Sequence, residues 1–565
     1  MSFMMISSRF LGLTAFLAAA FGAVAAAAAP PPADLKAQAD AIVEAAFPAD
    51  GPGGTVIITR GGRTIYAAAR GLADVEARRP IRPNSVFRLG SITKQFTAAV
   101  ILQLVQEGKV SLDDPVTRFF PDYPQPGGSA TVRQLLNHTS GIQSYTSIPG
   151  WMVEANTNRP YTTAEAIAVF RGLPSPTPPG QVWAYNNSGY TLLGAIIEKA
   201  TGKPWHQAIE ERISRPLGLR TIGYGVDRET RPDMVRGYTA GDGAVRPALR
   251  IHMSVPHGAG ALVGTVEDLA KWAHALHHGR VVNAANYAAM TSPTALPEGR
   301  SHPYGFGLQF DELRGRRTIG HGGGIFGFVT DSLYMPDEDV FVAVFTNSDE
   351  PPVHPSVLTA RLAALAIGDP FATMSTAEVD PQTLAPLFGV YRVGEAGVSR
   401  RFFSRDGKLY TRRDGGGDLE VFPAGGDRFF YGPNSLTWFR IERRPDGAHA
   451  MEMHHNGSNE AERAVRIGDV PPEAPAAAVS RAILESYVGR YRSEGPEIDI
   501  AMGANGALTI TLTGQPALPL RPTSDTEFVV QGPNATAVFH SENGQPNRIV
   551  INHGGRILEG RRVPR

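Results

Sequence analysis

The sequence predicts an α+β domain followed by two small antiparallel β-barrels, and three observations lead to that prediction. From about residue 33 to residue 368, helical and strand patterns alternate along the chain. Beyond Asp369, helical periodicity nearly vanishes, and short strands separated by Gly, Asp and Asn turns take over. This second part repeats itself after about 100 residues, a period too long for one solenoid unit and suited to a small barrel or sandwich.

The N-terminus has the pattern of a secretory signal peptide. Arg9 is the only charged side chain before the apolar run of residues 10–27, and A-x-A sequences precede Pro30. We therefore expect residues 1–29 to be removed and the mature protein to be periplasmic or secreted. The alternative is an uncleaved anchor, because the run approaches the length that spans a bilayer. No later run in the sequence is that long, so we expect no stable membrane insertion after cleavage.

Composition excludes several classes of function. The 565 residues include 54 Lys and Arg against 54 Asp and Glu, so the formal net charge is zero and no basic surplus indicates nucleic-acid binding. The chain has no cysteine, which excludes disulfides, cysteine nucleophiles and thiolate metal sites. Hydrophobic residues make up 42% of the chain, which is enough for large cores, and the length suggests three or four domains.

The first domain begins with an amphipathic helix pattern over residues 33–47. Residues 54–60 and 63–69 are rich in β-branched side chains and flank Gly61-Gly62, which predicts a β-hairpin. Because strands also end the domain, we expect one sheet built from both ends of the domain, with helices packed on it. Further helices are expected over 95–106 and 190–200 and from 266 to 277, and strands over 332–335 and 340–347.

The repeat can be followed residue by residue in the second part of the chain. Leu387–Arg392 aligns with Tyr487–Arg492, and Asp406–Leu409 aligns with Asn505–Leu508. A Pro- and Ala-rich stretch separates the two copies and has the composition of a linker. The expected organisation is a signal peptide over 1–29, the first domain over 30–370, barrel repeats over 383–469 and 481–565, and a linker over 470–480.

Ser91 and Lys94 form the first candidate for chemistry. They lie three residues apart where a helix is expected to begin, so their side chains share one face. A serine hydroxyl needs a neighbouring base, and a lysine in a dry pocket can lose its proton and act as one. Backbone N–H groups at the helix start can stabilise an oxyanion. Taken alone, the pair is better explained as a helix-capping serine with a solvated lysine.

Two more polar turns follow in the first domain. Tyr185 and Asn187 lie between a Pro-Gly loop and the apolar helix at 190–200, where a phenol can move a proton and an amide can bind a ligand. His321 opens a run with four glycines between residues 321 and 327, which permits close backbone approach to a ligand. An ordinary polar turn and a flexible glycine turn are the respective alternatives.

A metal site is a weaker hypothesis. His274 and His278 are four residues apart on an expected helix, a spacing that can chelate a metal ion. The glutamate of H-E-x-x-H is absent and no third ligand stands out, so a solvated helix end is the favoured interpretation. We therefore predict no metal and no cofactor.

Taken together and in this order, Ser91-x-x-Lys94, Tyr185-x-Asn187 and His321-x-Gly323 resemble the motifs of the serine β-lactamase and penicillin-binding-protein superfamily. Tyr-x-Asn in second place is similar to the class C β-lactamase branch, the family S12 peptidases. The resemblance covers about residues 35–365. It implies an antiparallel sheet with helices on both faces plus a helical subdomain. Supporting segments are 86–97, 135–141, 179–180, 193–194, 216–219 and 264–270.

The resemblance also implies roles for the first two motifs. Ser91 would be the acylated nucleophile, and Lys94 would help to deprotonate it. Tyr185 would relay protons to the leaving group or to the deacylating water, and whether Lys94 or Tyr185 is the principal base stays open. Asn187 would bind the substrate amide.

The third motif departs from true β-lactamases, which carry a lysine there. His321 would take that position, with Gly323 closing the motif, and the backbone N–H groups of Ser91 and Gly324 would form the oxyanion hole. Histidine is mostly neutral at pH 7, so its weaker, pH-dependent charge suits a substrate without an obligatory carboxylate.

A histidine there, followed by two barrels, is similar to the D-aminopeptidases, in which a barrel loop shapes recognition of the free amino end. The acidic residues Asp414, Asp418 and Asp427 are then candidate acceptors for that amine. The sequence thus predicts an exported serine hydrolase that forms an acyl-enzyme on small peptides, amides or esters. The alternatives are β-lactamase or D,D-carboxypeptidase activity, or a penicillin-recognising sensor without significant turnover. Nothing in the sequence predicts an oligomeric state.

Overall fold

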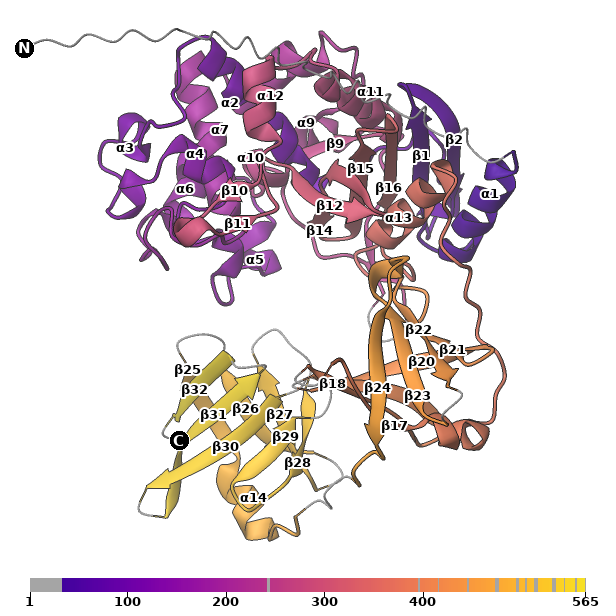
Figure 1. The fold of residues 1–565 in the computed structure, drawn as a ribbon. Coiled ribbons are helices and arrows are strands. Elements are labelled where there is room, and N and C mark those ends of the chain that lie inside the picture. Colours follow the sequence, from indigo (N-terminus) through magenta and orange to yellow (C-terminus); the bar gives the residue numbers. More distant parts are fainter. Residues whose placement is uncertain are drawn as a thin grey trace, which may run out of the picture.

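An α+β domain and two closed eight-stranded antiparallel barrels make up the described part of the chain (Figure 1), which confirms the predicted fold class. The computed structural model describes residues 33–563 apart from short internal segments; the expected signal peptide lies outside the described residues. No helix among them is both long enough and apolar enough to span a bilayer. The internal segments not described are 241–243, 395–396, 415, 445–446, 473–476, 494–496, 504–505, 513–516, 531–534, 543 and 554–555.

The main sheet joins the two ends of the first domain, as predicted. The first hairpin and the last strand meet edge to edge, with Gly54 opposite Thr346, and every pairing is antiparallel. Strand β14 (Gly323–Ile325) lies off the main path and pairs only with β15. The strand order is β12 (Gln309–Leu313), β13 (Arg316–Gly320), β15 (Phe328–Met335), β16 (Val340–Thr346), β1 (Gly54–Arg60) and β2 (Arg63–Arg70).

The alternation of side chains along β16 explains why both faces of the sheet are covered. Val340, Val342 and Val344 pack with helices α1 (Leu35–Ala46) and α13 (Pro355–Ala366). The side chains between them, Phe341, Ala343 and Phe345, join the larger core on the opposite face, which includes α11 (Val266–His277) and α2 (Thr93–Gln106). Because both faces are buried, this strand has a continuous apolar sequence.

The helical subdomain surrounds α2 and α7 (Asn187–Thr201), which pack on each other and on α10 (His257–Gly260). Helix α7 begins three residues before the predicted start, because the side chain of Asn186 accepts a hydrogen bond from the Gly189 N–H and caps it. It ends at Gly202, as expected. The remaining helices are α3 (Val116–Phe119), α4 (Val132–Leu136), α5 (Glu154–Thr157), α6 (Thr163–Arg171), α8 (Trp205–Ile209), α9 (Gly225–Arg228) and α12 (Ala284–Met290).

Short strands complete the first domain. Strands β5, β9 and β6 form a three-stranded sheet, and the others form two-stranded pairs. Their bounds are β3 (Leu72–Asp74), β4 (Arg79–Pro80), β5 (Phe87–Arg88), β6 (Gly223–Tyr224), β7 (Tyr238–Thr239), β8 (Arg246–Pro247), β9 (Leu262–Gly264), β10 (Thr294–Ala295) and β11 (Ser301–His302).

The two barrels repeat the same internal contacts. The buried Tyr391 hydroxyl donates to the Leu387 carbonyl, and Tyr491 does the same to Tyr487. The first strand of each copy pairs with its last and closes the barrel. The first barrel comprises β17 (Gly389–Arg392), β18 (Ser399–Arg405), β19 (Lys408–Arg413), β20 (Asp418–Gly425), β21 (Arg428–Phe430), β22 (Trp438–Arg443), β23 (His449–His454) and β24 (Glu462–Gly468). The second follows α14 (Arg481–Tyr487) and comprises β25 (Gly489–Ser493), β26 (Ile498–Met502), β27 (Leu508–Leu512), β28 (Leu518–Pro522), β29 (Glu527–Val530), β30 (Ala535–Glu542), β31 (Gln545–His553) and β32 (Arg556–Arg562).

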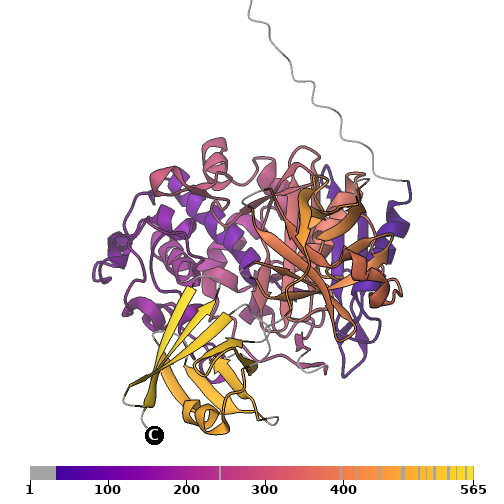
Figure 2. The same cartoon turned by 60° about the horizontal axis from the view of Figure 1, so that its bottom comes forward.

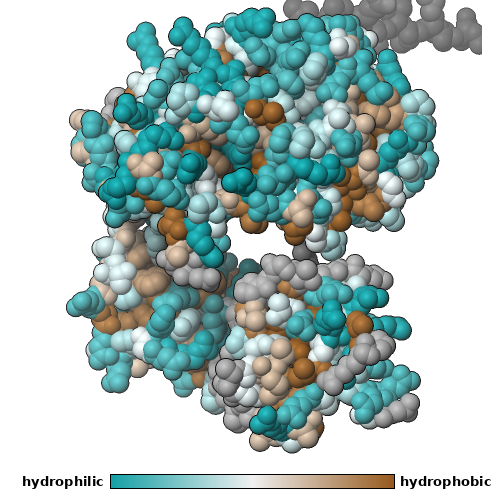
Figure 3. Space-filling model, turned by 180° about the vertical axis from the view of Figure 1, so that it is seen from behind, coloured by the Kyte–Doolittle hydropathy of each residue, from teal (hydrophilic) through white to brown (hydrophobic). Residues whose placement is uncertain are grey.

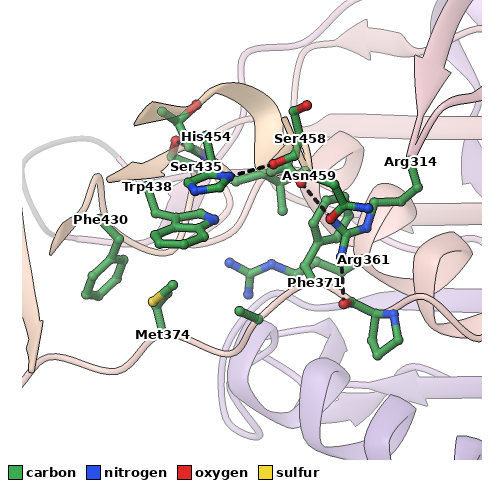
Figure 4. Close-up of a pocket in the computed structure, with 15 residues that line it drawn as sticks. Arg314, Arg361, Phe371, Met374, Phe430, Ser435, Trp438, His454, Ser458 and Asn459 are labelled. Atoms are coloured by element: carbon green, nitrogen blue, oxygen red, sulfur yellow. Dashed lines mark hydrogen bonds between the residues drawn. The ribbon is translucent and has the colours of Figure 1, made fainter. Parts of the chain in front are cut away.

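Both barrels lie on one side of the first domain (Figures 1 and 2), and the view from behind shows an opening between them and that domain (Figure 3). Arg314 is one of the links to the first barrel, together with hydrogen bonds between Asn434 and residues 352 and 354. The Arg314 guanidinium donates to the carbonyls of Pro370 and Gly457 at 2.8 and 2.7 Å and stacks over Phe371. A cavity of about 260 Å³ lies at this junction, and Trp438 and other aromatic side chains line it (Figure 4).

Candidate active site

Glycines bring Ser91 and strand β14 together. Ser91 lies in the 3-10 turn Gly90–Ile92, directly before α2, and Gly90 has a φ of 54°. A Cβ on Gly90 would lie 3.0 Å from the Gly324 nitrogen, and one on Gly323 would lie 2.1 Å from the Leu89 carbonyl oxygen. Only glycine permits this approach, so the sequence of the turn and of the glycine run sets the distance between the serine and the strand.

Lys94 connects the first two motifs. Its Nζ lies 3.0 Å from the Ser91 Oγ, 2.8 Å from the Asn187 Oδ1 and 2.9 Å from the Ala259 carbonyl oxygen. The residue is fully buried. Burial lowers the pKa of the amine well below its ordinary value, because water no longer stabilises the charged form.

The three contacts of Lys94 show where its lone pair points. The oxygens of Asn187 and Ala259 can only accept hydrogen bonds, so a neutral amine donates its two hydrogens to them. The lone pair then faces Ser91, whose hydroxyl can both donate and accept. The geometry therefore fits a neutral lysine that receives the proton of the serine.

Tyr185 and Asn187 both lie close to this amine. The Lys94 Nζ is 4.7 Å from the centre of the Tyr185 ring. Burial raises the pKa of the Tyr185 phenol above its ordinary value, and a hydrogen bond with Ser91 only partly opposes the shift. Asn187 is the first residue of α7, and its amide nitrogen donates to the Thr146 hydroxyl at 3.1 Å. Tyr185 is thus a protonated phenol in contact with the nucleophile.

His321 belongs to a buried chain of hydrogen bonds in which each donor can be assigned. The Asn186 N–H donates to the His138 Nδ1, so the other nitrogen of that neutral ring carries the hydrogen and donates to the Tyr304 hydroxyl at 3.0 Å. The hydroxyl hydrogen then goes to the His321 Nε2, also at 3.0 Å. This leaves the His321 Nδ1–H to donate to the Gly322 carbonyl at 2.5 Å.

These hydrogen bonds hold His321 as a neutral ring, and both of its ring nitrogens have a hydrogen-bond partner. Only 3% of the residue is exposed, and burial, reinforced by the positive charge that Lys94 can carry, lowers the pKa of His321 to about 3. The pH-dependent charge expected from the sequence therefore does not form near neutral pH, because the ring has no water to stabilise it. In this structure the imidazole supports the glycine run.

A cavity of about 340 Å³ opens over the nucleophile. Ser91, Asn187 and Gly324 line it, whereas Lys94, Tyr185, His321 and Gly323 are not among its lining residues. Its described lining comes entirely from the first domain, with no described barrel residue. Apolar side chains dominate, and the lining residues are Gly90, Ser91, Tyr145, Thr146, Met152, Asn187, Ile251, Pro256, Ala259, Gly260, Gly324, Ile325, Phe326, Phe328, Val329 and Asp349.

The three acidic residues proposed to accept an amine are engaged inside the first barrel instead. Asp414 accepts from the Ser399 N–H, Asp418 is bonded by Arg405 and Arg412, and Asp427 lies 3.4 Å from Arg443.

Sequence reasoning missed two groups of the site. His138 lies in the 135–141 segment that supported the resemblance, but its link to His321 through Tyr304 depends on tertiary contact alone. The Ala259 carbonyl, which holds Lys94, is a backbone group and leaves no sequence signal.

Comparisons with known proteins agree with this geometry. The family model described as Beta-lactamase matches residues 40–366. A D-aminopeptidase of Gluconobacter oxydans (strain 621H) is 30% identical over 379 residues, covering 65% of this chain and 67% of the relative. A penicillin-binding protein of Bacillus subtilis (strain 168) is 27% identical over 431 residues, covering 72% and 94%.

Two solved structures are also similar to this chain. The D-amino acid amidase of Ochrobactrum anthropi SV3, complexed with L-phenylalanine amide, is 28% identical with a TM-score of 0.51 and covers 59% of this chain and 98% of that one. A penicillin-binding protein homologue from Pyrococcus abyssi is 26% identical with a TM-score of 0.53, covering 77% and 99%.

Proposed function

The chain belongs to the beta-lactamase family and is a serine hydrolase of that superfamily, and we propose that it cleaves small amides and peptides that begin with a D-amino acid. The observation that carries the proposal is the buried Lys94 amine, whose lone pair faces the Ser91 hydroxyl. The names of the D-aminopeptidase and D-amino acid amidase relatives support the substrate class.

The proposed mechanism follows from the positions of the groups. Lys94 takes the hydroxyl proton of Ser91 while the Oγ attacks the substrate carbonyl carbon. The negative charge that develops on the carbonyl oxygen is stabilised by the backbone N–H groups of Ser91 and Gly324. The tetrahedral adduct collapses to an ester on Ser91 and releases the amine, which takes a proton from the Tyr185 phenol.

Water completes the cycle. It attacks the ester carbon and gives its proton to the phenolate of Tyr185, and the protonated Lys94 returns its proton to the Ser91 oxygen as the acid is released. Because burial raises the pKa of Tyr185 and lowers that of Lys94, we assign the lysine as the base of acylation and the phenol as the acid.

Covalent labelling tests the nucleophile. A fluorophosphonate probe should label the wild type, and Ser91→Ala should abolish labelling. Ser129→Ala, which changes an exposed serine outside the cavity, should leave labelling unchanged. A folded wild-type protein that the probe does not label would contradict the proposed chemistry.

A substrate panel tests the specificity. D-alanine p-nitroanilide should be cleaved faster than its L-isomer, with p-nitrophenyl butyrate as a general ester and nitrocefin as a β-lactam. Nitrocefin as the best substrate by a wide margin would replace the proposal with β-lactamase activity. A chain that ends after Pro370 should lose substrate preference if the barrels contribute to recognition, and an unchanged profile would assign them another role.

Export is the remaining part of the proposal. Its support is the apolar segment and the A-x-A sequences of residues 10–29. N-terminal sequencing of the protein from the periplasmic or culture fraction should show a mature chain that begins near Pro30. Recovery of the uncleaved chain in the cytoplasm would contradict it.

A further inference from the structure

One carboxylate in the wall of the Ser91 cavity has no part in the mechanism. Asp349 is the only charged residue among the described residues that line the cavity. It lies beyond the end of β16, and its backbone N–H donates to the Tyr238 carbonyl at 3.0 Å, which fixes its position. The wall around it is mostly apolar.

The two oxygens of Asp349 differ in their surroundings. The Oδ2 accepts a hydrogen bond of 2.9 Å from the Gly327 N–H. The Oδ1 is shielded from solvent and has no hydrogen-bond partner in the described structure. A buried carboxylate oxygen without a partner costs free energy, and a role in the site is one of the reasons for which proteins retain such groups.

Asp349 is also tied to the predicted oxyanion hole. Gly327, which it holds, follows Gly324 by three residues, and β14 lies between the nucleophile turn and β15. Phe326 and Phe328 flank Gly327 and line the cavity as well. A ligand that acylates Ser91 therefore lies in a cavity whose described lining is mostly apolar and holds one carboxylate, that of Asp349.

We propose that the carboxylate of Asp349 binds an ammonium group on the acyl part of the substrate, so that the site selects amino-acid amides over neutral amides. The inference rests on the proposed function. The cation has two possible sources, the α-ammonium of the terminal residue or a basic side chain. A cavity of about 340 Å³ has room for an amino-acid amide or a short peptide.

Binding to a protein that cannot react provides the test. Ser91→Ala protein is titrated calorimetrically with D-phenylalanine amide, with its neutral analogue 3-phenylpropanamide, and with N-acetyl-D-lysine amide. The α-ammonium source predicts tight binding of the first ligand, and the side-chain source predicts tight binding of the third. If the contact is a charge-assisted hydrogen bond, Asp349→Asn should weaken the affinity for the preferred cation about 10- to 100-fold. The affinity for the neutral amide should change by no more than about twofold.

The neighbouring residue offers a matched control. Glu350 is exposed and does not line the cavity, so Glu350→Gln should leave all three affinities unchanged. Equal affinity for cationic and neutral amides, or a cation affinity that Asp349→Asn leaves unchanged, would overturn the inference. Because binding requires no turnover, a protein that binds the cation through Asp349 but hydrolyses no amide would refute the proposed function and leave this inference standing.

A second, independent site lies at the end of α11. The structure supplies the third ligand that the sequence does not show: Asp339 lies beside His274 and His278, and one ligand atom of each lies within 4.8 Å of the others. Asp339 is in the turn between β15 and β16, and the Gly61 N–H donates to its carbonyl at 2.9 Å. Three separate segments thus hold the cluster in place.

The hydrogen bonds of His278 leave its second nitrogen available. Its Nδ1 lies 2.9 Å from the His274 carbonyl oxygen and must donate to it, so the neutral ring presents a lone pair on Nε2. That atom faces the Asp339 Oδ2 at 3.3 Å. Two acceptors at this distance repel unless a proton or a metal ion lies between them, and 3.3 Å is about the ligand separation of a tetrahedral zinc site.

We infer that His274, His278 and Asp339 bind a divalent transition metal such as Zn²⁺, with water completing the shell. Titration of the full chain with Zn²⁺ should show one site, and His278→Ala or Asp339→Asn should weaken it at least about tenfold. His449→Ala, in the first barrel, should have no effect. Zinc binding that survives both cluster substitutions, or no binding by the wild type, would overturn the inference and leave an imidazolium–carboxylate ion pair.

Discussion

Replacing Tyr304 with phenylalanine removes one hydroxyl from the centre of the hydrogen-bond chain behind the active site. That hydroxyl accepts from His138 and donates to His321, each at 3.0 Å. The ring of Tyr304 is 1% exposed, so water does not replace the missing group. Tyr304→Phe therefore leaves one imidazole N–H and one imidazole lone pair buried without partners.

The expected cost follows from those two groups. A buried polar group left without a partner costs about 1–3 kcal/mol, so the free energy of unfolding should fall by roughly 2–4 kcal/mol. Tyr161→Phe is the matched control, because it removes one hydroxyl that donates to the Asn156 carbonyl at a half-buried position. It should cost about 1 kcal/mol or less. Urea unfolding of both variants and of the wild type measures the difference.

Tyr304→Phe should also slow the reaction of Ser91, because it changes the position of groups around the active site. His321 precedes β14 and supports the glycine run that carries Gly324, so its movement shifts a predicted oxyanion donor. We expect fluorophosphonate labelling of Ser91 to slow by roughly tenfold, because small displacements of catalytic groups have large effects on rate. In the wild type, nitrogen NMR should show the hydrogen of His321 on Nδ1. A hydrogen on the His321 Nε2, or a Tyr304→Phe variant as stable and as reactive as the wild type, would refute the assigned hydrogen bonds.

Three further predictions test other parts of the structure. Lys94→Met should slow Ser91 labelling at least about 100-fold while the fold is retained by circular dichroism, and an unchanged rate would exclude Lys94 as the base. Burial lowers the pKa of His277 to about 3, so protonation of this ring favours the unfolded state. From pH 6.5 down to about pH 3 this ring contributes a fall in the free energy of unfolding of about 1.4 kcal/mol per pH unit, in addition to the contribution of other buried histidines such as His321. His277→Phe should remove that contribution from pH-dependent urea unfolding, and parallel curves for variant and wild type would contradict it. Arg314→Ala should lower the free energy of the first unfolding transition by about 2 kcal/mol and expose the segment before the first barrel to protease, with Ser91 labelling unchanged. Equal protease resistance would contradict the role of Arg314 in holding that segment.

The fold was predictable where burial determines composition. Strand β16 is buried on both faces and therefore has an unbroken apolar sequence, and the hairpin β1–β2 is marked by Gly61-Gly62. The start of α7 was predicted three residues late, because Asn186 caps the helix with its side chain and a polar residue of this kind is equally common in turns. The pairing of the first hairpin with β16 followed only from the position of strands at both ends of the domain.

The candidate site was predictable within each motif and not between motifs. Ser91 and Lys94 share a helical face, so their spacing alone predicts the contact that the structure shows at 3.0 Å. Asn187 reaches the same amine from 93 residues away. The family resemblance assigned both residues to one site but did not predict this contact. Neither spacing nor the family resemblance indicated a role for Tyr304. Its role depends on His138 and His321, which only folding brings to its hydroxyl.

In the third motif, burial changes the charge that the sequence suggests for His321. In the sequence, His321 takes the place of a lysine and predicts a weaker, pH-dependent charge, which suits a substrate without an obligatory carboxylate. In the structure both of its nitrogens are engaged, and the motif presents to the cavity only the backbone of Gly324. The described lining of that cavity contains no cationic side chain, and its one charge is the carboxylate of Asp349. A substrate carboxylate, which β-lactams carry, would meet like charge there, whereas an ammonium would meet opposite charge. The charge of the cavity therefore supports the proposed preference for amino-acid amides over β-lactams.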